Sequence, residues 1–509
     1  MGMVKRKELL FILTLVLVSV ILRVFFFFYT EDDAFITFRY VKNFLDGKGF
    51  VYNLGENVLG ITNSLYAFIL ILFGKWELNF ILFGKIINVL SEGLSILLIG
   101  IIVRKWGQSK IWILSVFLFV ISPPNIGWCA SGMETSFYIL FLLLSFYLYL
   151  ERRFILLGIS SGILFLIRPD GGQLLFVLFF DYLIFDIFKP ILSGKENYSK
   201  KILDLWREHK SALASVVVFC IVVLPWLIFC YSKYGSFLPN SIRAKFITYP
   251  GTPEGSNFFD SILYFLSPGP RLILTIFFVI GFIGILDNKC YRVSGVYFLF
   301  SLLLMAISRV HLFSWYFAPL LPFYYIIASR GMELYLEKAS SLNKFRDREL
   351  LLHRIFLSVF IFILLALSVY STWRLYKNLK SHSEGLEACH KNIGLWIKDN
   401  TPTNSIICVG DIGYIGYYSE RKIIDFMGLV SPEVLPFWKK GMPGEIIKEF
   451  KPDYFVVGQY DYFFQIVKDN DWFNRNYKME KKFGGRNNIY YVFIRKNNYP
   501  NPAIRSVNS

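Results

Sequence analysis

Two adjacent aspartates, and an arginine seven positions after the first, are the residues of this chain with the clearest potential for chemistry. Asp32, Asp33 and Arg39 lie in the stretch YTEDDAFITFRY, which follows a run of four phenylalanines. Seven residues make nearly two helical turns, so Asp32 and Arg39 would share one helix face. A carboxylate can take a proton from a hydroxyl group, and a guanidinium can hold a phosphate. The pair predicts a site for both groups.

The simplest alternative is that the acids only begin a helix. Carboxylates in a first turn satisfy free N–H groups and suit the helix dipole. That alternative explains one acid but not three, because Glu31 precedes the two aspartates. The following segment, DGKGFVYNLGENVLGITNSLY, is rich in turn-forming Gly and Asn, and structured loops of this kind commonly carry function. We therefore expect a functional loop over residues 29–61.

Further polar side chains stand at the ends of apolar segments. The candidate ligands of a donor phosphate are Arg243, Lys245, Arg39, Arg168, Arg309 and His311. The candidate substrate contacts are Glu31, Asn53, Glu56, Asn63, Glu134, Asp170 and Asn240. Taken singly, each also fits an anchor at the headgroup level of a membrane. Their convergence on one membrane side favours binding of a lipid-linked phosphate.

Membrane helices are the elements that must position these residues. The chain has 509 residues, 55% of them hydrophobic and 19% aromatic, with a mean hydropathy of +0.48, which is typical of an integral membrane protein. A bilayer core of roughly 30 Å needs about 20 apolar residues per helix. Eleven segments qualify: 8–28, 80–103, 111–126, 134–150, 154–167, 173–188, 211–231, 271–287, 292–308, 312–329 and 353–373. Segment 62–74 is a further span or a re-entrant helix.

The net charge of +17 indicates orientation rather than nucleic-acid binding. With the N-terminus inside, loops on the cytoplasmic side carry 22 Lys and Arg residues and those outside carry 9. Cations concentrate in loops that stay cytoplasmic. The first apolar run has no small-residue cleavage site, so we read it as a retained helix rather than a signal peptide. We predict a multi-pass protein of the cell inner membrane, with Asp32 and the C-terminal region outside.

The predicted organisation has two parts. Residues 1–375 form a helical membrane domain with exterior loops 29–61 and 232–270, and residues 385–509 form a small extracytoplasmic α/β domain. The second part alternates strands (SIICVGD, RKIIDFMG, DYFVVGQ, IYYVFIR) with helices (HKNIGLWIKDNTP, GEIIKEFKP). Its GDIGYIG lacks the spacing of a nucleotide-binding fingerprint. Cys389 and Cys408 form either a disulfide or, as the apolar run around Cys408 favours, buried free thiols.

Several blocks together resemble a known family. DDAFITFRY, with the following GFVYNLGENVLGITNSLY, resembles the first exterior loop of GT-C glycosyltransferases that use polyprenyl-phosphate sugars. The nearest likeness is to the bacterial branch of terminal β-arabinofuranosyltransferases. GMETSFY, LIRPDG, YGSFLPNSIRAK and DIGYIGYYSERKIIDFMGLVSPE resemble later blocks of that branch. Relatives commonly have Tyr at Phe35 and Glu at Leu59.

The resemblance implies a hexosyl- or pentosyltransferase. It implies an aspartate that acts as general base on an acceptor hydroxyl, and cations, sometimes with a divalent metal, that hold the donor phosphate. We expect Asp32 to be the base and Asp33 to orient it or bind a metal such as Mg, Mn or Ca; the reverse order is the alternative. No other cofactor is expected. The implied partners are a polyprenyl-phosphate sugar, membrane lipids, and a glycan, lipid or protein acceptor outside the cell.

Two other functions share parts of this pattern. An envelope polymerase or ligase would have the same topology but a lipid-linked oligosaccharide as donor. A lipid-linked sugar transporter or flippase would need charges deep inside the spans. We count few charges near the middle of the predicted spans, Arg23 and Asp181 among them, whereas the acids cluster outside the spans.

Overall fold

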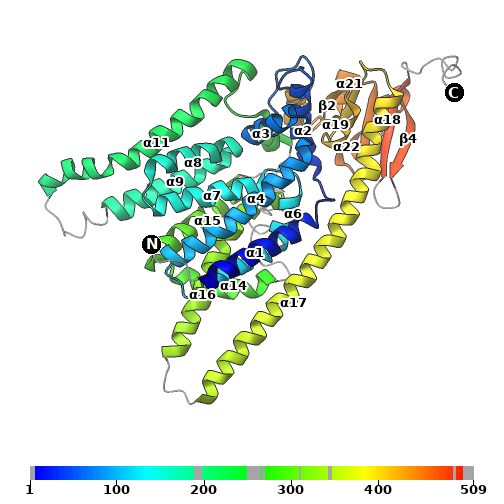
Figure 1. Cartoon of the computed structure of the whole chain (residues 1–509). Coiled ribbons are helices and arrows are strands. Elements are labelled where there is room, and N and C mark those ends of the chain that lie inside the picture. The colour runs from blue at the N-terminus through cyan, green and yellow to red at the C-terminus, as the bar shows by residue number, and fades with distance from the viewer. Residues whose placement is uncertain are drawn as a thin grey trace.

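A computed structural model describes residues 6–188, 198–248, 265, 270–308, 311–341, 347–484 and 489–496. The described chain is mostly helical and carries one small sheet near its C-terminus (Figure 1). The helices of the larger part are α1 (Arg6–Val24), α2 (Asp32–Leu45), α3 (Ser64–Lys75), α4 (Phe80–Ile101), α5 (Trp112–Val120), α6 (Pro123–Ala130), α7 (Thr135–Leu150), α8 (Phe154–Ile167), α9 (Gly172–Asp181), α11 (Tyr198–Tyr234), α12 (Asn240–Thr248), α14 (Pro270–Ile283), α15 (Lys289–Ile307), α16 (Leu321–Ser341) and α17 (Asp347–Leu386).

A helix can cross a membrane only if it is long and apolar enough. Five described stretches meet both conditions: Phe80–Trp106, Pro169–Phe188, Ala212–Tyr234, Lys289–Ile307 and Ser358–Asn400. The bent pair α5 and α6 makes a sixth. The shorter apolar helices are Leu10–Val24, Ser64–Lys75, Thr135–Leu150, Phe154–Ile167 and Arg271–Ile283. The chain is thus built as an integral membrane protein, and the number of eleven spans stays a prediction.

Two predicted spans are not continuous helices. Segment 111–126 breaks between α5 and α6 with a bend of 52°, because Pro123 and Pro124 lack the N–H groups that would extend α5. Segment 312–329 starts as two short 3₁₀ turns, Ser314–Tyr316 and Ala318–Leu320, before α16 begins. Both irregular stretches line cavities described below.

The C-terminal part is a five-stranded sheet with helices around it. Its strands are β1 (Ile406–Val409), β2 (Lys422–Asp425), β3 (Tyr454–Gly458), β4 (Tyr477–Gly484) and β5 (Ile489–Arg495), in the order β2-β1-β3-β5-β4. β1 pairs in parallel with β2 and β3, and β5 is antiparallel to β3 and β4. Its helices are α18 (Asn392–Asn400), α19 (Tyr414–Ser419), α20 (Leu435–Lys439), α21 (Glu445–Phe450), α22 (Tyr462–Val467) and α23 (Asp471–Asn476). The four predicted strands are present; β4, a polar strand, was not predicted.

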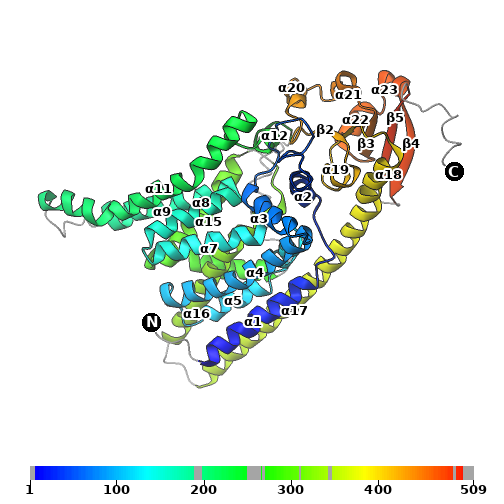
Figure 2. The same cartoon turned by 45° about the horizontal axis from the view of Figure 1, so that its top comes forward.

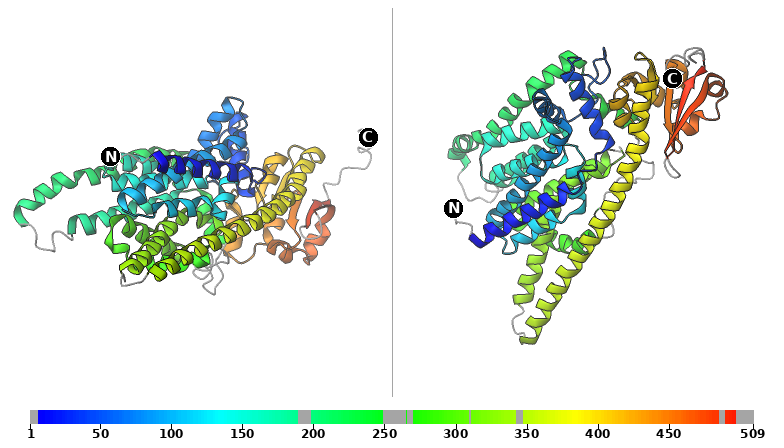
Figure 3. Two further views of the ribbon diagram at one scale, coloured as in Figure 1. Left: turned by 60° about the horizontal axis from the view of Figure 1, so that its bottom comes forward. Right: turned by 45° about the vertical axis from the view of Figure 1, so that its right-hand side comes forward.

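The two parts are joined by a single long helix. α17 runs diagonally along the helix bundle and continues to the sheet, at the opposite end of the molecule from the N-terminus (Figures 2 and 3). All six cysteines are free thiols, so Cys389 and Cys408 do not form a disulfide.

The predicted first loop packs on the sheet rather than standing free. Buried apolar residues of α2 and the following loop, such as Phe35 and Ile61, belong to one cluster with Ile393, Ile415 and Val456 of the C-terminal part. Gly60 marks how close the contact is, because a Cβ there would lie 2.5 Å from the Cγ1 atom of Val430. The sequence therefore folds its acidic helix into a core that it shares with the C-terminal domain.

Candidate active site

Asp32 faces the C-terminal domain. Its carboxylate accepts hydrogen bonds from the backbone N–H groups of Gly413 (3.0 Å) and Tyr414 (2.9 Å) and lies 3.3 Å from Nδ1 of His390. Burial alone would raise the pKa of Asp32, but the contact with His390 and the two backbone donors outweigh it and lower that pKa. A carboxylate held this firmly in its charged form is a poor proton acceptor. The position of Asp32 instead suits a contact that holds α2 against the C-terminal domain.

Arg39 also connects α2 to the C-terminal domain. Its guanidinium donates to the backbone oxygens of Tyr52 (2.9 Å), Gly416 (2.7 Å) and Arg421 (2.6 Å), and it stacks on the Tyr52 ring. Asn53 next to Tyr52 extends the interface, since its side chain exchanges hydrogen bonds with both backbone groups of Ile423. The face that carries Asp32 and Arg39 therefore holds the domains together, in place of the predicted hydroxyl and phosphate pocket. Only one part of that prediction holds: the two residues do share a face.

Other predicted site residues also lie outside the cavity described next. Glu31 accepts a hydrogen bond from the hydroxyl of Tyr29, and Glu56 forms an ion pair with Lys422. Asn240 donates to the backbone oxygens of Gly428 and Leu429. Arg243 and His311 are exposed to solvent, and Arg309 lies outside the described residues.

Asp33 faces a cavity on the other side of α2. The cavity has a volume of about 320 Å³ and lies between α2, the loop after it, the residues just before α7, the segment 168–173, α12, the end of α15 and the turn Ser314–Tyr316. Six of the predicted residues line it: Asp33, Asn63, Glu134, Arg168, Asp170 and Lys245. Because consecutive helix residues point about 100° apart, Asp33 can enter this cavity while Asp32 contacts the other domain. The cavity thus collects acids and cations from four separate segments of the chain.

The electrostatic environment prepares Asp33 to accept a proton near neutral pH. Burial raises the pKa of Asp33 to about 7, an effect that the charge of Lys245 opposes and that the carboxylates of Asp32, Glu31 and Glu134 increase. A general base works best when its pKa lies near the working pH. Asp33 therefore has the property that Asp32 lacks.

Two cations and a tyrosine also line this cavity. Arg168 pairs with Asp170 through two hydrogen bonds of 3.1 and 2.7 Å, while its buried Nη1 has no hydrogen-bond partner among the described residues. Lys245 donates to the hydroxyl of Tyr316 at 3.1 Å, and the Arg168 guanidinium lies 5.4 Å from the centre of the same ring. These side chains present positive charge and an unsatisfied donor to the cavity, which suits a phosphate.

A chain of hydrogen bonds fixes the remaining polar lining. Asn63 donates to the carboxylate of Glu134 at 2.7 Å and lies 3.1 Å from the hydroxyl of Thr37, which donates to it. All three residues are buried. Such a network holds these side chains in fixed positions at the cavity.

The described residues include no group of three or more His, Cys, Asp or Glu side chains placed to hold a metal ion. The predicted metal-binding role of Asp33 remains an expectation.

Sequence reasoning missed two features of the site. Tyr316 was not among the predicted site residues, although Pro319, three positions later, indicates irregular structure there. The docking role of Tyr52 and Asn53 depends on contacts with residues about 370 positions later, for which the spacing within the loop gives no signal.

The docking contacts predict a stability effect. Arg39→Lys keeps the charge but loses the planar fork that reaches three carbonyl oxygens. We expect the free energy of unfolding to fall by about 2–3 kcal/mol, since hydrogen bonds to charged groups contribute about 1.5–3 kcal/mol each. Thermal unfolding and limited proteolysis of the purified protein measure it. Lys42→Arg, in the exposed pair with Glu420, is the matched control and should change stability by under about 1 kcal/mol. Equal stability of the two variants would refute the docking role.

Comparisons with known proteins place the fold. Residues 377–499 match a domain of unknown function, DUF8728. A search of curated proteins found no match. The crystal structure of ArnT from Cupriavidus metallidurans bound to undecaprenyl phosphate superposes with a TM-score of 0.60, over 96% of this chain and 98% of that chain, at 13% identity. The apo form of that protein gives a TM-score of 0.59 over 95% and 97%, again at 13% identity.

This chain shares the ArnT fold. The likeness extends over nearly the whole length of both chains, and so includes the sheet as well as the helix bundle. At 13% identity it establishes architecture.

Proposed function

We propose that the protein is a GT-C glycosyltransferase that moves a sugar from a polyprenyl-phosphate donor to a hydroxyl acceptor. One observation carries the proposal: Asp33, whose pKa is about 7, lines the same cavity as Arg168 and Lys245. The shared fold supports it, because the superposed ArnT was crystallised with undecaprenyl phosphate. The sequence blocks that resemble arabinofuranosyltransferases support a pentose as the sugar, with a hexose as the alternative.

In the proposed reaction the acceptor hydroxyl lies against Asp33. The carboxylate takes its proton while the oxygen forms a bond to the anomeric carbon of the sugar. The bond from that carbon to the phosphate oxygen breaks, and its electron pair leaves with the polyprenyl phosphate. Arg168 and Lys245 stabilise the charge that develops on the phosphate. Glu134, Asn63 and Asp170 hold sugar hydroxyls through their fixed carboxylate and amide groups.

A direct binding measurement tests the donor part of the proposal. The purified protein should bind undecaprenyl phosphate in detergent at least about tenfold more tightly than undecaprenol, because a single charged hydrogen bond to phosphate contributes about 1.5–3 kcal/mol. Equal affinity for the two lipids would argue against a phosphate site.

The pKa of Asp33 predicts how transfer depends on pH. The proton acceptor is the carboxylate, so kcat/KM should rise with pH and level off above a midpoint of about 7. Lys245 lowers the pKa of Asp33 through its charge, so Lys245→Gln should move the midpoint to higher pH. A flat profile between pH 5 and pH 8 would show that Asp33 does not act as the base.

We also propose that the cavity and the C-terminal domain lie on the extracytoplasmic face. The excess of Lys and Arg in the opposite loops supports this orientation. A cysteine introduced at the exposed position Ser381 should react with a membrane-impermeant reagent in intact cells, and one at Lys201 should not. The reverse pattern would invert the topology.

A further inference from the structure

The loop GDIGYIG, residues 410–416, lies against the start of α2. It follows β1 and leads into α19, which lies beside α2 (Figure 2). A loop that joins a parallel strand to a helix commonly holds a ligand phosphate on its backbone N–H groups. In this chain the N–H groups of Gly413 and Tyr414 hold the carboxylate of Asp32 instead. The loop therefore binds a side chain of the membrane domain.

Gly413 allows the loop to come this close to α2. A Cβ atom at this position would overlap the backbone oxygen of Asp32 and would lie 2.6 Å from its Cγ atom. Because the obstacle is backbone, it cannot turn aside as the end of a long side chain can. Gly413 therefore fixes how near the C-terminal domain stands to the first residue of α2.

His390 completes the contact from a different element. It belongs to the π-helical segment Glu387–Lys391 that joins α17 to α18, and helices of this kind are rare and frequently occur at functional sites. The side chain is 4% exposed, with Nδ1 3.3 Å from Oδ1 of Asp32. Its ring packs edge-to-face on Tyr490 of β5, whose hydroxyl donates to Asp411 of the loop at 2.7 Å. These three residues form one connected chain behind Asp32.

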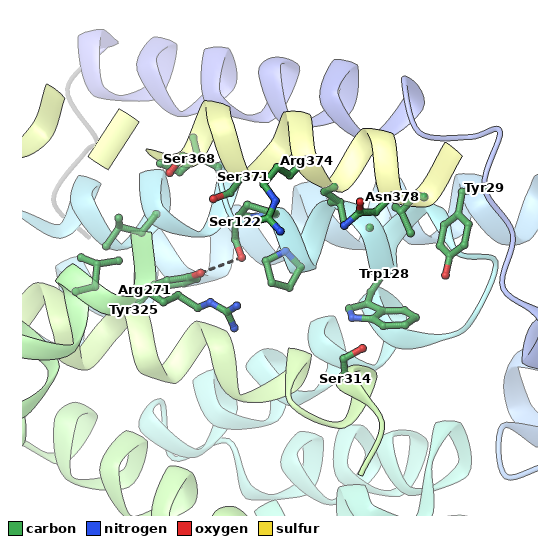
Figure 4. Close-up of a pocket in the computed structure, with 18 residues that line it drawn as sticks. Tyr29, Ser122, Trp128, Arg271, Ser314, Tyr325, Ser368, Ser371, Arg374 and Asn378 are labelled. Carbon is green, nitrogen blue, oxygen red and sulfur yellow. Dashed lines mark hydrogen bonds between the residues drawn. The ribbon is translucent and has the colours of Figure 1, made fainter. Parts of the chain in front are cut away.

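The membrane helices anchor the segment that enters α2. Lys85 of α4 donates to the backbone oxygens of Phe27 and Tyr29, both at 2.6 Å, and Ser383 of α17 donates to that of Phe28 at 3.1 Å. Tyr29 also lines a second cavity of about 560 Å³, which lies between α17, the break of α5 and α6, α14 and α16 (Figure 4). The start of α2 is thus held between these helices and the C-terminal domain.

Any shift of Asp32 is passed directly to Asp33, because the two residues are neighbours in the first turn of α2. The first N–H groups of a helix have no partners within it. The preceding Glu31 supplies no side-chain cap for them. Contacts to Asp32 from outside the helix therefore set where the carboxylate of Asp33 lies in the reaction cavity.

We propose that His390 and Gly413 are positioning residues, which place the carboxylate of Asp33 against the acceptor hydroxyl. This role rests on the proposed sugar transfer, in which Asp33 is the general base. Both residues act through Asp32, since neither lines the reaction cavity. The C-terminal domain thereby takes part in catalysis, although the base itself belongs to the membrane domain.

Hydrogen exchange, followed by mass spectrometry on the purified protein in detergent, tests the contact without any assay of transfer. In His390→Phe, which keeps a ring against Tyr490 but loses Nδ1, and in Gly413→Ala, the first turn of α2 and the GDIGYIG loop should exchange at least about tenfold faster than in wild type.

Two substitutions are matched controls for this measurement. A Cβ on Gly444 would meet only side chains of α22, the nearest at 3.0 Å, so Gly444→Ala should exchange as wild type does. His382 is 49% exposed on α17, and His382→Phe should likewise leave exchange unchanged. Wild-type exchange in both test variants, or equally fast exchange in the controls, would overturn the contact.

Transfer kinetics test the positioning role. His390→Phe and Gly413→Ala should each lower kcat about 10–100-fold at an unchanged KM for the donor, because a misplacement of about 1 Å can cost about 100-fold in rate while Arg168 and Lys245 stay in place. The amide of His390→Asn can lie where Nδ1 lies, so this variant should recover most of the rate. In an Asp33→Asn background neither substitution should reduce the residual rate further.

Three outcomes would overturn the positioning role. Wild-type kcat in both variants would show that the contact does not place the base. A raised donor KM, or a further loss in the Asp33→Asn background, would show that the substitutions disturb the fold in general. Wild-type protein that transfers no sugar from any donor would refute the proposed function as well, and the exchange rates would then still show whether His390 and Gly413 hold α2.

Discussion

Asp33→Asn is expected to lower the rate of sugar transfer by about 10²–10⁴-fold while the protein folds and binds undecaprenyl phosphate as wild type does. The amide is nearly the same size as the carboxylate, yet it cannot take the acceptor proton, and losses of this size are typical when a general base is removed. Steady-state transfer with saturating donor measures the effect. Full activity in the well-folded variant would remove Asp33 from the reaction.

The same substitution should raise stability above pH 7. Burial lifts the pKa of Asp33 from 3.8 to about 7, so the folded protein favours the carboxylic acid. Stability from this group is present below about pH 4 and is lost as the pH rises to 7 and above. Asparagine does not ionise, so Asp33→Asn should unfold at a higher temperature than wild type at pH 8, and this difference should shrink toward pH 4.

Asp32→Asn is the control that separates the two aspartates. An amide can accept only one of the two backbone N–H groups that Asp32 now accepts, and it loses the charge facing His390. We expect lower stability, with a smaller loss of transfer than in Asp33→Asn. If Asp32→Asn were inactive and Asp33→Asn active, the base would be Asp32, as the sequence alone first suggested.

The second large effect concerns the donor phosphate. Replacing Arg168 and Lys245 together by glutamine should lower kcat/KM for the donor at least about 100-fold, because each charged hydrogen bond contributes about 1.5–3 kcal/mol. Lys245→Gln alone is the cleaner variant, since removal of Arg168 also leaves Asp170 without its ion-pair partner. Arg243→Gln, two positions away and exposed, is the matched control. A loss as large in the control as in Lys245→Gln would mean that the donor phosphate lies outside the cavity.

Membrane helices and most of the strands could be predicted from the sequence, because hydropathy and periodicity depend only on neighbouring residues. Long apolar runs predict membrane helices, and short β-rich runs predicted β1, β2, β3 and β5. β4 was not predicted because its sequence YKMEKKFG is mostly polar, as suits an edge strand that exposes its side chains. The break after α5 could have been read from Pro123 and Pro124, whose missing N–H groups end a helix.

The roles within the acidic motif depend on contacts that no local pattern contains. Helical geometry shows that Asp32 and Asp33 point in different directions, but not which direction meets a domain about 380 residues later. The pattern singled out Asp32 and Arg39 because they share a face. That face contacts Gly413, Gly416 and Arg421 of the C-terminal domain. Asp33, which points away from that face, lines the cavity instead. Glu134, Arg168 and Lys245, in contrast, were found from their positions at the ends of apolar segments.

Turnover of a doubly labelled donor tests whether the protein transfers a sugar from polyprenyl phosphate. The purified protein is incubated with polyprenyl-phosphate pentoses and hexoses that carry one label in the sugar and another in the lipid phosphate, together with a membrane extract as acceptor. We predict that one donor yields free polyprenyl phosphate and a glycosylated product in equal amounts, and that Asp33→Asn abolishes both. Folded wild-type protein that leaves every donor intact would contradict the proposed sugar transfer. An Asp33→Asn variant that releases both products at the wild-type rate would contradict the proposed role of Asp33.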